Sequence, residues 1–550
     1  MKMTTLGLWV CIGAILTNGA LMGCLGDLKV APSGNGGAGG AGGTGGAGAG
    51  GETTICSPGM TSPCNTGQFG ICAEGIATCD ADGMNFGPCQ LTNTPVFDDC
   101  TTAEDDDCDG TPISQCTGTV DWTTTRTGAN AAPMDDSVFG IAVTPQGEYV
   151  ITGVVDGSID SGVNVNSGKF YLAKFDATGI KQWERSLAAT LLVAGHDVAV
   201  DSQGNIIVVG EYRGNFIFDN NSFASNNNSR DIFVAKFDSA GKTLWAKSYG
   251  TASNDLGKAV VVDSSDNIVF TGWARGGTIN FGTGNMSANA DDACLVKLAP
   301  DGTPLWSKVF VNGSDQHGQA LALAPNGDIV LGGESNGNFS LGGSPHTVAD
   351  GFDAFLGRFA GADGAFLWSR VFVGSADQFT RGVTMAKNGN PILLGRFAMG
   401  IDFGGGNVFT TMGGSTGFLA EFDAATGIHV QSRAFGTTGT TFPLGIAVDQ
   451  AGHVYIEGSF GGTIDFGMTS IPSTVGLDEF TVKLDAMTWS PLWLRATGNA
   501  GDQNGTALTV DGQGRAIVGG SFATELVGPT PADTLLTTGG LDLFVQRLQP

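Results

Sequence analysis

Positive charge is scarce in this chain. Its 550 residues hold 26 Lys and Arg against 53 Asp and Glu, which gives a formal net charge of −27. Such an acidic surface repels phosphate backbones and anionic lipid leaflets, so we expect no nucleic-acid partner and no docking through a basic patch. Histidine is also rare, with 5 residues, and we find no His-x-x-x-His pair, phosphate loop or sialidase-type Ser-x-Asp-x-Gly-x-x-Trp box. The sequence therefore predicts a protein that is not an enzyme.

Long hydrophobic runs are missing as well. The apolar stretch near the N-terminus, Leu6 to Leu16, has 11 residues, which is too short to span a bilayer and is typical of a signal peptide. The Leu-Met-Gly-Cys sequence at 21–24 resembles a bacterial lipobox, whose cysteine is lipidated and becomes the mature N-terminus. We expect a lipoprotein signal peptide over 1–23, lipidation of Cys24 and, by this resemblance, anchoring in the outer membrane or at the cell surface. Ordinary cleavage near Ala20 is the alternative.

A glycine-rich segment follows the lipobox. Of the 18 residues from Gly34 to Gly51, 12 are glycine, so no side chain there can build a core. A flexible coil of this length reaches about 23 Å end to end. We therefore predict that 24–51 is a lipidated N-terminus and tether that holds the folded part of the chain off the membrane.

The next segment, 52–118, is crowded with cysteine. An even number of cysteines in an exported segment with few apolar residues predicts four disulfides, because so small a unit needs covalent links to stay folded. A metal–thiolate site is the alternative, but no Cys-x-x-Cys pair occurs. The spacing leaves the pairing open. The cysteines are Cys56, Cys64, Cys72, Cys79, Cys89, Cys100, Cys108 and Cys116.

Carboxylates near the end of this segment follow the spacing of a calcium loop. Asp105, Asp107 and Asp109 precede Gly110 in the order that the first half of such a loop requires. Together with the cysteines, this element resembles the Cys-rich modules of bacterial surface lipoproteins. Cys116 stands where a bidentate glutamate closes a calcium loop. Two interpretations stay open, a weak extracellular Ca²⁺ site and a solvated acidic turn, and we expect no other cofactor.

The rest of the chain is a tandem repeat. Tryptophan recurs at steps of 61, 62, 61 and 62 residues and then after 125, with Gln431 at the skipped place. Each unit also holds a β-rich hairpin that ends in glycine and a phrase like Asp-x-Phe-Val-Ala-Lys-Phe-Asp at 231–238. Four short strands per unit with no helical period predict an all-β fold, a seven-bladed β-propeller over 119–550. The tryptophans are Trp122, Trp183, Trp245, Trp306, Trp368 and Trp493, and the seven closing glycines are Gly153, Gly210, Gly272, Gly333, Gly395, Gly458 and Gly520.

The two ends of the repeat complement each other. The repeat begins with the tryptophan strand around Trp122 and stops after the strand around Phe544, which lacks a tryptophan strand of its own. We predict that these two strands pair and close the ring, which removes exposed sheet edges. The pattern resembles the β-propeller repeat family of bacterial secreted proteins, a resemblance that implies the fold and leaves the function open.

Most repeated residues are expected to be structural. The tryptophans should fill the space between blades. The basic residue of the Asp-x-Phe-Val-Ala-Lys-Phe-Asp-like segment should pair with a neighbouring Asp. Cys294 replaces a phenylalanine of its blade and should be a buried lone thiol that behaves as a small apolar side chain.

Candidate binding residues come from the innermost strand of each blade. In each copy this strand ends in three mostly apolar residues before a turn, as in 198–200. The residue two positions before these three differs among the seven copies, although its neighbours repeat. Blade packing therefore does not dictate the residue at this position. Consecutive blades place donors side by side there, which suits an anionic or sugar ligand at the channel mouth. The alternative is that these side chains only solvate a water-filled channel. The four donors are His196, Lys258, Gln319 and Arg381, and the other copies carry Phe139, Leu444 and Thr506.

A second ring of polar residues lies four positions upstream. A ring of carboxylates could bind cations or act as a paired acid and base. The alternative is that each residue caps its own loop by accepting a backbone N–H. The seven residues are Asp135, Leu192, Asn254, Asp315, Asp377, Thr440 and Asp502.

The leading functional hypothesis is a non-catalytic, lipid-anchored surface protein whose propeller binds a protein or glycan partner. A secreted polysaccharide lyase or hydrolase at the channel mouth is one alternative, and binding of calcium or another metal by the Cys-rich module is another. An enzyme should carry a carboxylate beside His196 or Arg381 in a closed pocket, whereas a scaffold should leave an open channel.

Overall fold

Strands dominate the computed structural model. It describes residues 56–65, 74–81, 85–91, 118–126 and 134–550, apart from 161–163, 349, 405, 407, 412, 413, 437, 468, 469, 474, 499, 500, 527–533 and 538. One 3₁₀ turn, η2 (Asn226–Asn228), interrupts the strands. Within these ranges there is no helix long and apolar enough to cross a membrane.

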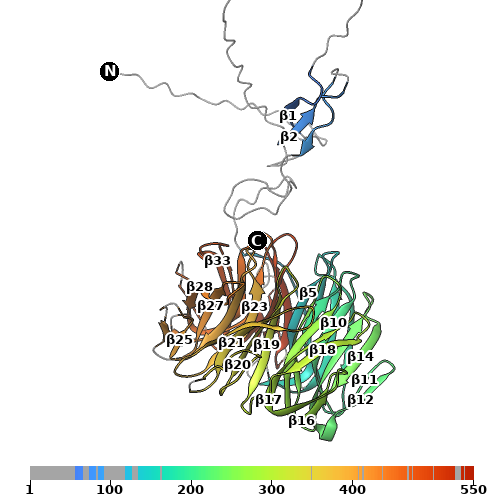
Figure 1. The fold of residues 1–550 in the computed structure, drawn as a ribbon, viewed down its shortest axis with the longest axis vertical. Helices are drawn as coiled ribbons and strands as arrows, with labels where there is room; N and C mark the ends of the chain where they lie inside the picture. Colours follow the sequence, from blue (N-terminus) through green and yellow to red (C-terminus); the bar gives the residue numbers. More distant parts are fainter. Residues whose placement is uncertain are drawn as a thin grey trace, which may run out of the picture.

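Seven antiparallel blades of four strands each form the propeller, and one parallel bridge joins the first two blades. Figure 1 shows the blades packed side by side. The first strands of neighbouring blades contact one another all round the ring, so these strands are innermost, as the sequence predicts. Blade 1 has β5 (Asp135–Val143), β6 (Tyr149–Asp160), β7 (Asn164–Phe175) and β8 (Lys181–Ala188). Blade 2 has β9 (Leu192–Val200), β10 (Ile206–Arg213), β13 (Arg230–Phe237) and β14 (Thr243–Tyr249). The parallel bridge lies between β7 and β9. Blade 3 has β15 (Leu256–Val262), β16 (Ile268–Asn280), β17 (Asn285–Leu298) and β18 (Pro304–Val309).

The second half of the ring repeats this plan. Blade 4 has β19 (Gln316–Leu323), β20 (Ile329–Ser335), β21 (Asp353–Phe359) and β22 (Phe366–Phe372). Blade 5 has β23 (Gln378–Met385), β24 (Pro391–Phe397), β27 (Thr416–Phe422) and β28 (His429–Phe435). Blade 6 has β29 (Thr438–Val448), β30 (Val454–Asp465), β32 (Asp478–Leu484) and β33 (Pro491–Thr497). Shorter strands extend the blades: β11 (Asn215–Phe218), β12 (Asn221–Ala224), β25 (Gly400–Asp402), β26 (Val408–Thr410), β31 (Ser470–Pro472), β36 (Glu525–Leu526) and β37 (Leu535–Leu536).

Blade 7 joins the two ends of the repeat, and its strands are β34 (Gln503–Val510), β35 (Ala516–Phe522), β38 (Asp542–Leu548) and β4 (Val120–Arg126). β38 pairs with β4, with Arg547 opposite Trp122 and Phe544 opposite Thr125. This pairing supplies the missing tryptophan strand, so the predicted closure and the predicted seven blades are both confirmed. Because β4 covers the edge of β38, the seventh blade has four strands like the other six.

The tryptophans lie between blades, as predicted. The Trp245 indole N–H donates to the Pro300 carbonyl in the next blade at 3.2 Å, and its ring packs on Gly302, where an added β-carbon would have no room. Lys236 donates to the same carbonyl and pairs with Asp201 of its own blade at 2.8 Å. Lys236, the basic residue of the repeated segment at 231–238, therefore links two blades, which fits a structural role.

Cys294 is fully buried, which confirms the expectation of a lone interior thiol. It lies among apolar residues of the interface between blades 2 and 3. Burial raises the pKa of this thiol well above its ordinary value, so Cys294 stays protonated and acts as an apolar side chain.

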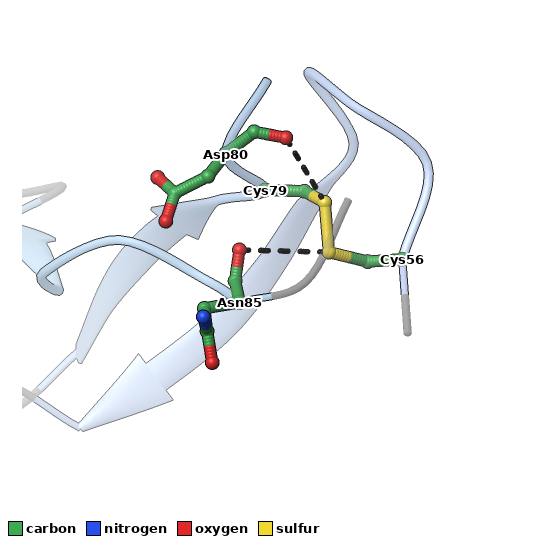
Figure 2. The surroundings of a disulfide bond; sticks show 4 residues. All are labelled: Cys56, Cys79, Asp80 and Asn85. Carbon is green, nitrogen blue, oxygen red and sulfur yellow. Dashed lines mark hydrogen bonds between the residues drawn. A yellow bond between two sulfur atoms is a disulfide. The ribbon is translucent and has the colours of Figure 1, made fainter. Parts of the chain in front are cut away.

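The N-terminal module contains a small sheet of β1 (Thr61–Asn65), β2 (Glu74–Thr78) and β3 (Gln90–Leu91). Two disulfides join its ends, Cys56–Cys79 and Cys64–Cys89. Figure 2 shows the first, whose Cys56 sulfur lies 3.6 Å from the Asn85 carbonyl oxygen. A disulfide sulfur carries no proton, so this is a close sulfur–oxygen contact. The other four cysteines of the module (Cys72, Cys100, Cys108 and Cys116) lie outside the described residues.

Candidate binding site at the channel mouth

Each innermost strand carries a β-bulge at the variable position singled out in the sequence, and β5 has a second irregularity at Asp136. At the bulge the pairing register with the second strand slips, so one residue is left without a partner. A bulge bends the strand and re-aims that side chain. The unpaired residues are Phe139 in β5, His196 in β9, Lys258 in β15, Gln319 in β19, Arg381 in β23, Leu444 in β29 and Thr506 in β34.

The closing glycines make these bulges possible. A β-carbon placed on Gly272 would lie 1.8 Å from the carbonyl oxygen of Leu256 in the bulged strand. Gly520 has the same relation to Asn504 at 1.8 Å. The other closing glycines would place a β-carbon between 2.0 and 2.2 Å from the matching carbonyl. No other residue fits there, because such distances are far below van der Waals contact.

All seven bulged residues line one cavity of about 200 Å³ at the centre of the ring. The structure thus brings together the four predicted donors, His196, Lys258, Gln319 and Arg381. They occupy blades 2 to 5, whereas Phe139, Leu444 and Thr506 complete the wall from blades 1, 6 and 7. The cavity is therefore two-sided, with donors and cations on one side and a mainly apolar surface on the other.

A buried carboxylate supports the first donor. His196 Nε2 lies 3.1 Å from Glu211 on the neighbouring strand β10, and Arg230 contacts both oxygens of Glu211 at 3.1 and 3.2 Å. Burial and the nearby Lys258 charge lower the pKa of His196. The imidazole is therefore neutral at neutral pH and can donate its Nε2 proton to Glu211.

A second buried carboxylate supports the third and fourth donors. The Gln319 amide donates to Glu334 at 2.6 Å, and Arg381 lies 3.8 Å from the other oxygen of Glu334. His317 lies between Glu334 at 3.6 Å and Asp291 at 3.2 Å. Burial works against its charged form, but these two carboxylates outweigh burial and raise the pKa of His317 to about 9. His317 therefore carries a positive charge at neutral pH.

The sequence analysis missed Glu211 and Glu334, although a signal was present. Both follow the closing glycine of their blades directly, at a position that the other blades fill with Val154, Trp273, Arg396, Ser459 and Ser521. This position varies as the bulged position does, and the two lie on neighbouring strands. Two adjacent variable positions in one repeat predict a functional surface better than either alone.

Asp197 is the carboxylate that lines the cavity itself. Its oxygens accept the backbone N–H groups of Val198 and, from the next blade, Val260, each at 2.8 Å. Burial raises the pKa of Asp197 to about 7 despite these bonds. Its neighbours at the same level of the ring are glycine or alanine, so the sequence alone could have marked Asp197 as an exception.

The polar ring four residues upstream joins neighbouring blades. Asp377 accepts the Phe352 N–H at 3.0 Å, and Asp502 accepts the Leu477 N–H at 2.9 Å. Asp135, Asn254 and Asp315 accept the corresponding N–H groups of Leu541, Arg230 and Asp291. The N–H belongs to the preceding blade in every case. The capping interpretation is therefore right in kind, but these residues cap the neighbouring blade, and Asp135 in addition accepts the Ile159 N–H of its own blade at 2.8 Å.

Two Gly-x-Ser-x-Gly sequences occur, around Ser335 and Ser415. Ser335 ends β20 and donates to the Gly337 carbonyl at 2.8 Å, and Ser415 precedes β27. A nucleophile elbow needs a strand that turns into a helix. Neither serine stands on such a turn, so the pattern is incidental here.

The remaining predicted site residues lie outside the described residues, namely Cys24, Asp105, Asp107 and Asp109. Among the residues that are described, no three His, Cys, Asp or Glu side chains gather as metal ligands. The calcium and lipidation hypotheses therefore stay predictions.

No family model matches the chain. An uncharacterised WD repeat-containing protein of Acanthamoeba polyphaga mimivirus is 25% identical over 255 residues, which is 40% of this chain and 18% of that protein. Regulatory protein FlaEY of Caulobacter vibrioides is 23% identical over 408 residues, 58% of this chain and 42% of that protein. The aligned regions thus span less than half the length of both relatives.

The chain is also similar to several solved structures at low sequence identity. The Dos1 propeller is 10% identical, with a TM-score of 0.40 over 78% of this chain and 95% of that one. The Neurospora crassa Pan2 WD40 domain is 11% identical, with a TM-score of 0.35 over 64% of this chain and 88% of that one. A europium-containing methanol dehydrogenase is 10% identical, with a TM-score of 0.38 over 78% of this chain and 93% of that one. The propeller fold of this chain rests on its own strand pairing.

Proposed function

We propose that this chain is an exported, lipid-anchored scaffold without catalytic activity, whose propeller binds a protein or glycan partner at the channel mouth. One observation carries the proposal: the seven side chains that strand pairing leaves free all line one cavity. Lys258, Gln319 and Arg381 offer donors to a ligand, and the neutral His196 offers an acceptor nitrogen. Glu211 and Glu334 hold His196 and Gln319 in place. Preoriented donors around a cavity are what a binding site requires.

The anchor rests on the N-terminal sequence. A signal peptide, Cys24 and a glycine-rich tether together suit a domain displayed at a membrane surface. Incorporation of labelled palmitate into the wild-type chain, and its loss in Cys24→Ser, is the expected result. Equal labelling of both chains would reject lipidation at this cysteine.

A glycan array and a pull-down with the full mature chain test the binding site. We expect Lys258→Ala combined with Arg381→Ala to weaken retention of the partner at least tenfold, because hydrogen bonds to charged groups contribute about 1.5–3 kcal/mol each. Lys242→Ala combined with Lys387→Ala removes the same charge from exposed positions away from the cavity and should change nothing. Equal loss in both pairs, or in neither, would reject the channel-mouth site.

A polysaccharide lyase or hydrolase is the second candidate, because carboxylates do lie beside His196 and Arg381. Glu211 and Glu334 are almost fully buried and engaged with neighbouring side chains. This leaves Asp197, whose pKa is raised to about 7, as the carboxyl suited to acid–base work in the cavity. Release of reducing ends or unsaturated sugars from acidic polysaccharides by the wild-type chain, abolished in Asp197→Asn, would favour this candidate over the scaffold.

A further inference from the structure

Two cations line one side of the cavity, and a third lies beside them. Lys258 on β15 and Arg381 on β23 line it, and Arg396 follows on β24 next to Arg381. Within the described part of the chain, no carboxylate oxygen lies within 4.0 Å of the charged groups of Lys258 or Arg396. The Arg396 Nε is buried without a hydrogen-bond partner. Arg381 donates to the Thr380 carbonyl at 2.7 Å, and among the described residues its one carboxylate neighbour within 4.0 Å is Glu334 at 3.8 Å, which also contacts Gln319 and His317.

These charges also repel one another. Burial lowers the pKa of Lys258, Glu211 opposes this effect, and Arg230 and Arg381 add to it. Burial and the neighbouring Arg381 lower the pKa of Arg396 to about 10. The two guanidinium groups nevertheless stay protonated at neutral pH. A half-buried group of like charges without counter-ions is unfavourable by itself and is relieved when an anion enters.

Aromatic rings connect the cations into one arc. Lys258 lies over Trp273 at 5.5 Å, and Trp273 packs against His317 with ring centroids 4.3 Å apart. Phe352 and Phe379 continue the column at 5.5 and 5.9 Å. Arg381 and Arg396 lie over Phe379 at 4.9 and 4.7 Å, and Arg396 also lies over Phe442 at 4.8 Å. Since the ring faces contact one another and the cations, mainly the ring edges, which are electropositive, are left for a ligand.

The opposite wall has a different character. Phe139 and Leu444 offer apolar surface, and the hydroxyl of Thr506 lies with them. His196 and Asp197 stand between Phe139 and Lys258, and Gln319 stands between Lys258 and Arg381. A ligand that matches the whole cavity needs an anionic group, several hydroxyls and an apolar face. An acidic side chain of a peptide supplies the anionic group but not the hydroxyls.

We propose that the cavity binds one hexuronate unit of an acidic glycan, with its carboxylate between Lys258 and Arg381, its C–H face against Phe139 and Leu444, and Arg396 adding positive charge beside Arg381. This proposal rests on the proposed function, because it names the ligand class of the same site. It adds Arg396, which the sequence analysis did not select. It also explains why a chain with a net charge of −27 concentrates cations at this place.

Titration calorimetry of the full mature chain at low salt tests the proposal with a galacturonate trisaccharide. The matching galactose trisaccharide lacks only the carboxylates and should bind at least tenfold more weakly. Lys258→Gln and Arg396→Gln should each reduce galacturonate affinity at least tenfold, and raising the salt concentration should weaken it further. Lys387→Gln, which removes a charge from an exposed turn, should leave the affinity unchanged. Melting curves of all variants show that the ring is intact.

The outcomes separate this proposal from the broader one. Equal affinity for the two trisaccharides, or no effect of Lys258→Gln and Arg396→Gln, overturns the uronate site. Binding of an oligoglutamate peptide in place of the trisaccharide also overturns it and favours an acidic protein partner, in which case the scaffold proposal stands. Retention of no glycan and no protein in the array and the pull-down is the result that ends the scaffold proposal itself.

Discussion

At the scale of the residue, the closing glycine and the bulged residue form one device. The glycine leaves room for the carbonyl two residues before the bulged residue, and the bulge turns one side chain out of the sheet into the channel. Packing therefore fixes the glycine and leaves the bulged side chain free to vary. This explains why the seven copies agree at Gly272 and its counterparts and differ at Lys258 and its counterparts.

Replacing a closing glycine should damage both stability and the site. For Gly272→Ala we expect a loss of about 1–3 kcal/mol, the usual effect of overpacking, because the new methyl group meets the Leu256 carbonyl. Gly512→Ala is the matched control, since an added β-carbon there meets nothing within 4 Å. Denaturant unfolding measures both. Similar midpoints for the two variants would contradict the proposed role of the glycine.

At the scale of the element, the junction between blades 5 and 6 reverses the usual packing. Elsewhere a tryptophan of one blade packs on a turn glycine of the next, as Trp368 packs on Gly427. At this junction Gln431 replaces the tryptophan, and Trp489 stands at the turn position with a φ of 53°. Trp489 is 2% exposed and packs against residues of blades 5 and 6. Trp489 of blade 6 therefore fills the space that a tryptophan at position 431 of blade 5 would occupy.

The exchange predicts strong coupling between two distant positions. Trp489→Gly alone should lose about 3–5 kcal/mol of stability by opening a cavity, and Gln431→Trp alone should overpack the junction. The double variant recreates the usual pair and should recover more than 1 kcal/mol relative to the sum of the single losses. Glu421, which Gln431 contacts at 2.7 Å, keeps Asn388 and Asn390 as partners. Additive losses in a double-mutant cycle would show that the two side chains do not share one gap.

At the scale of the whole molecule, many buried ionisable groups prefer their protonated form. Burial raises the pKa of Asp136 to about 6 and of Asp197 and Asp255 to about 7. His317, whose pKa is about 9, adds to this set through its carboxylate neighbours. The folded chain therefore binds protons that the unfolded chain releases, and self-repulsion at a net charge of −27 acts in the same direction.

Stability should consequently fall as pH rises from 5 to 9. The folded carboxyls keep protons up to about pH 6–7, whereas unfolded ones lose them near 3.8, so raising the pH favours unfolding across this window. The stabilisation from His317 is present below about 6.5 and is lost toward 9. Melting temperatures at pH 5, 7 and 9 and constant ionic strength measure the trend, which Asp255→Asn should flatten between 5 and 7. An optimum above pH 8 would contradict it.

The sequence by itself determined the architecture of this protein. The tryptophan period, the seven glycines and the complementary ends specify seven blades and their closure, because each depends on local backbone geometry that repeats along the chain. The variable ring of His196, Lys258, Gln319 and Arg381 could be selected for the same reason. A side chain that varies within a strict repeat is visible without coordinates.

Only the tertiary structure decided which partners these residues meet. Glu334 reaches Arg381 across 47 positions of sequence and a blade boundary, and Arg396 joins Arg381 only because strands β23 and β24 pair. Trp489 likewise compensates for Gln431 from the neighbouring blade. Such contacts depend on how two blades pack side by side, and each blade carries its own substitutions there, so no periodic signal reports them.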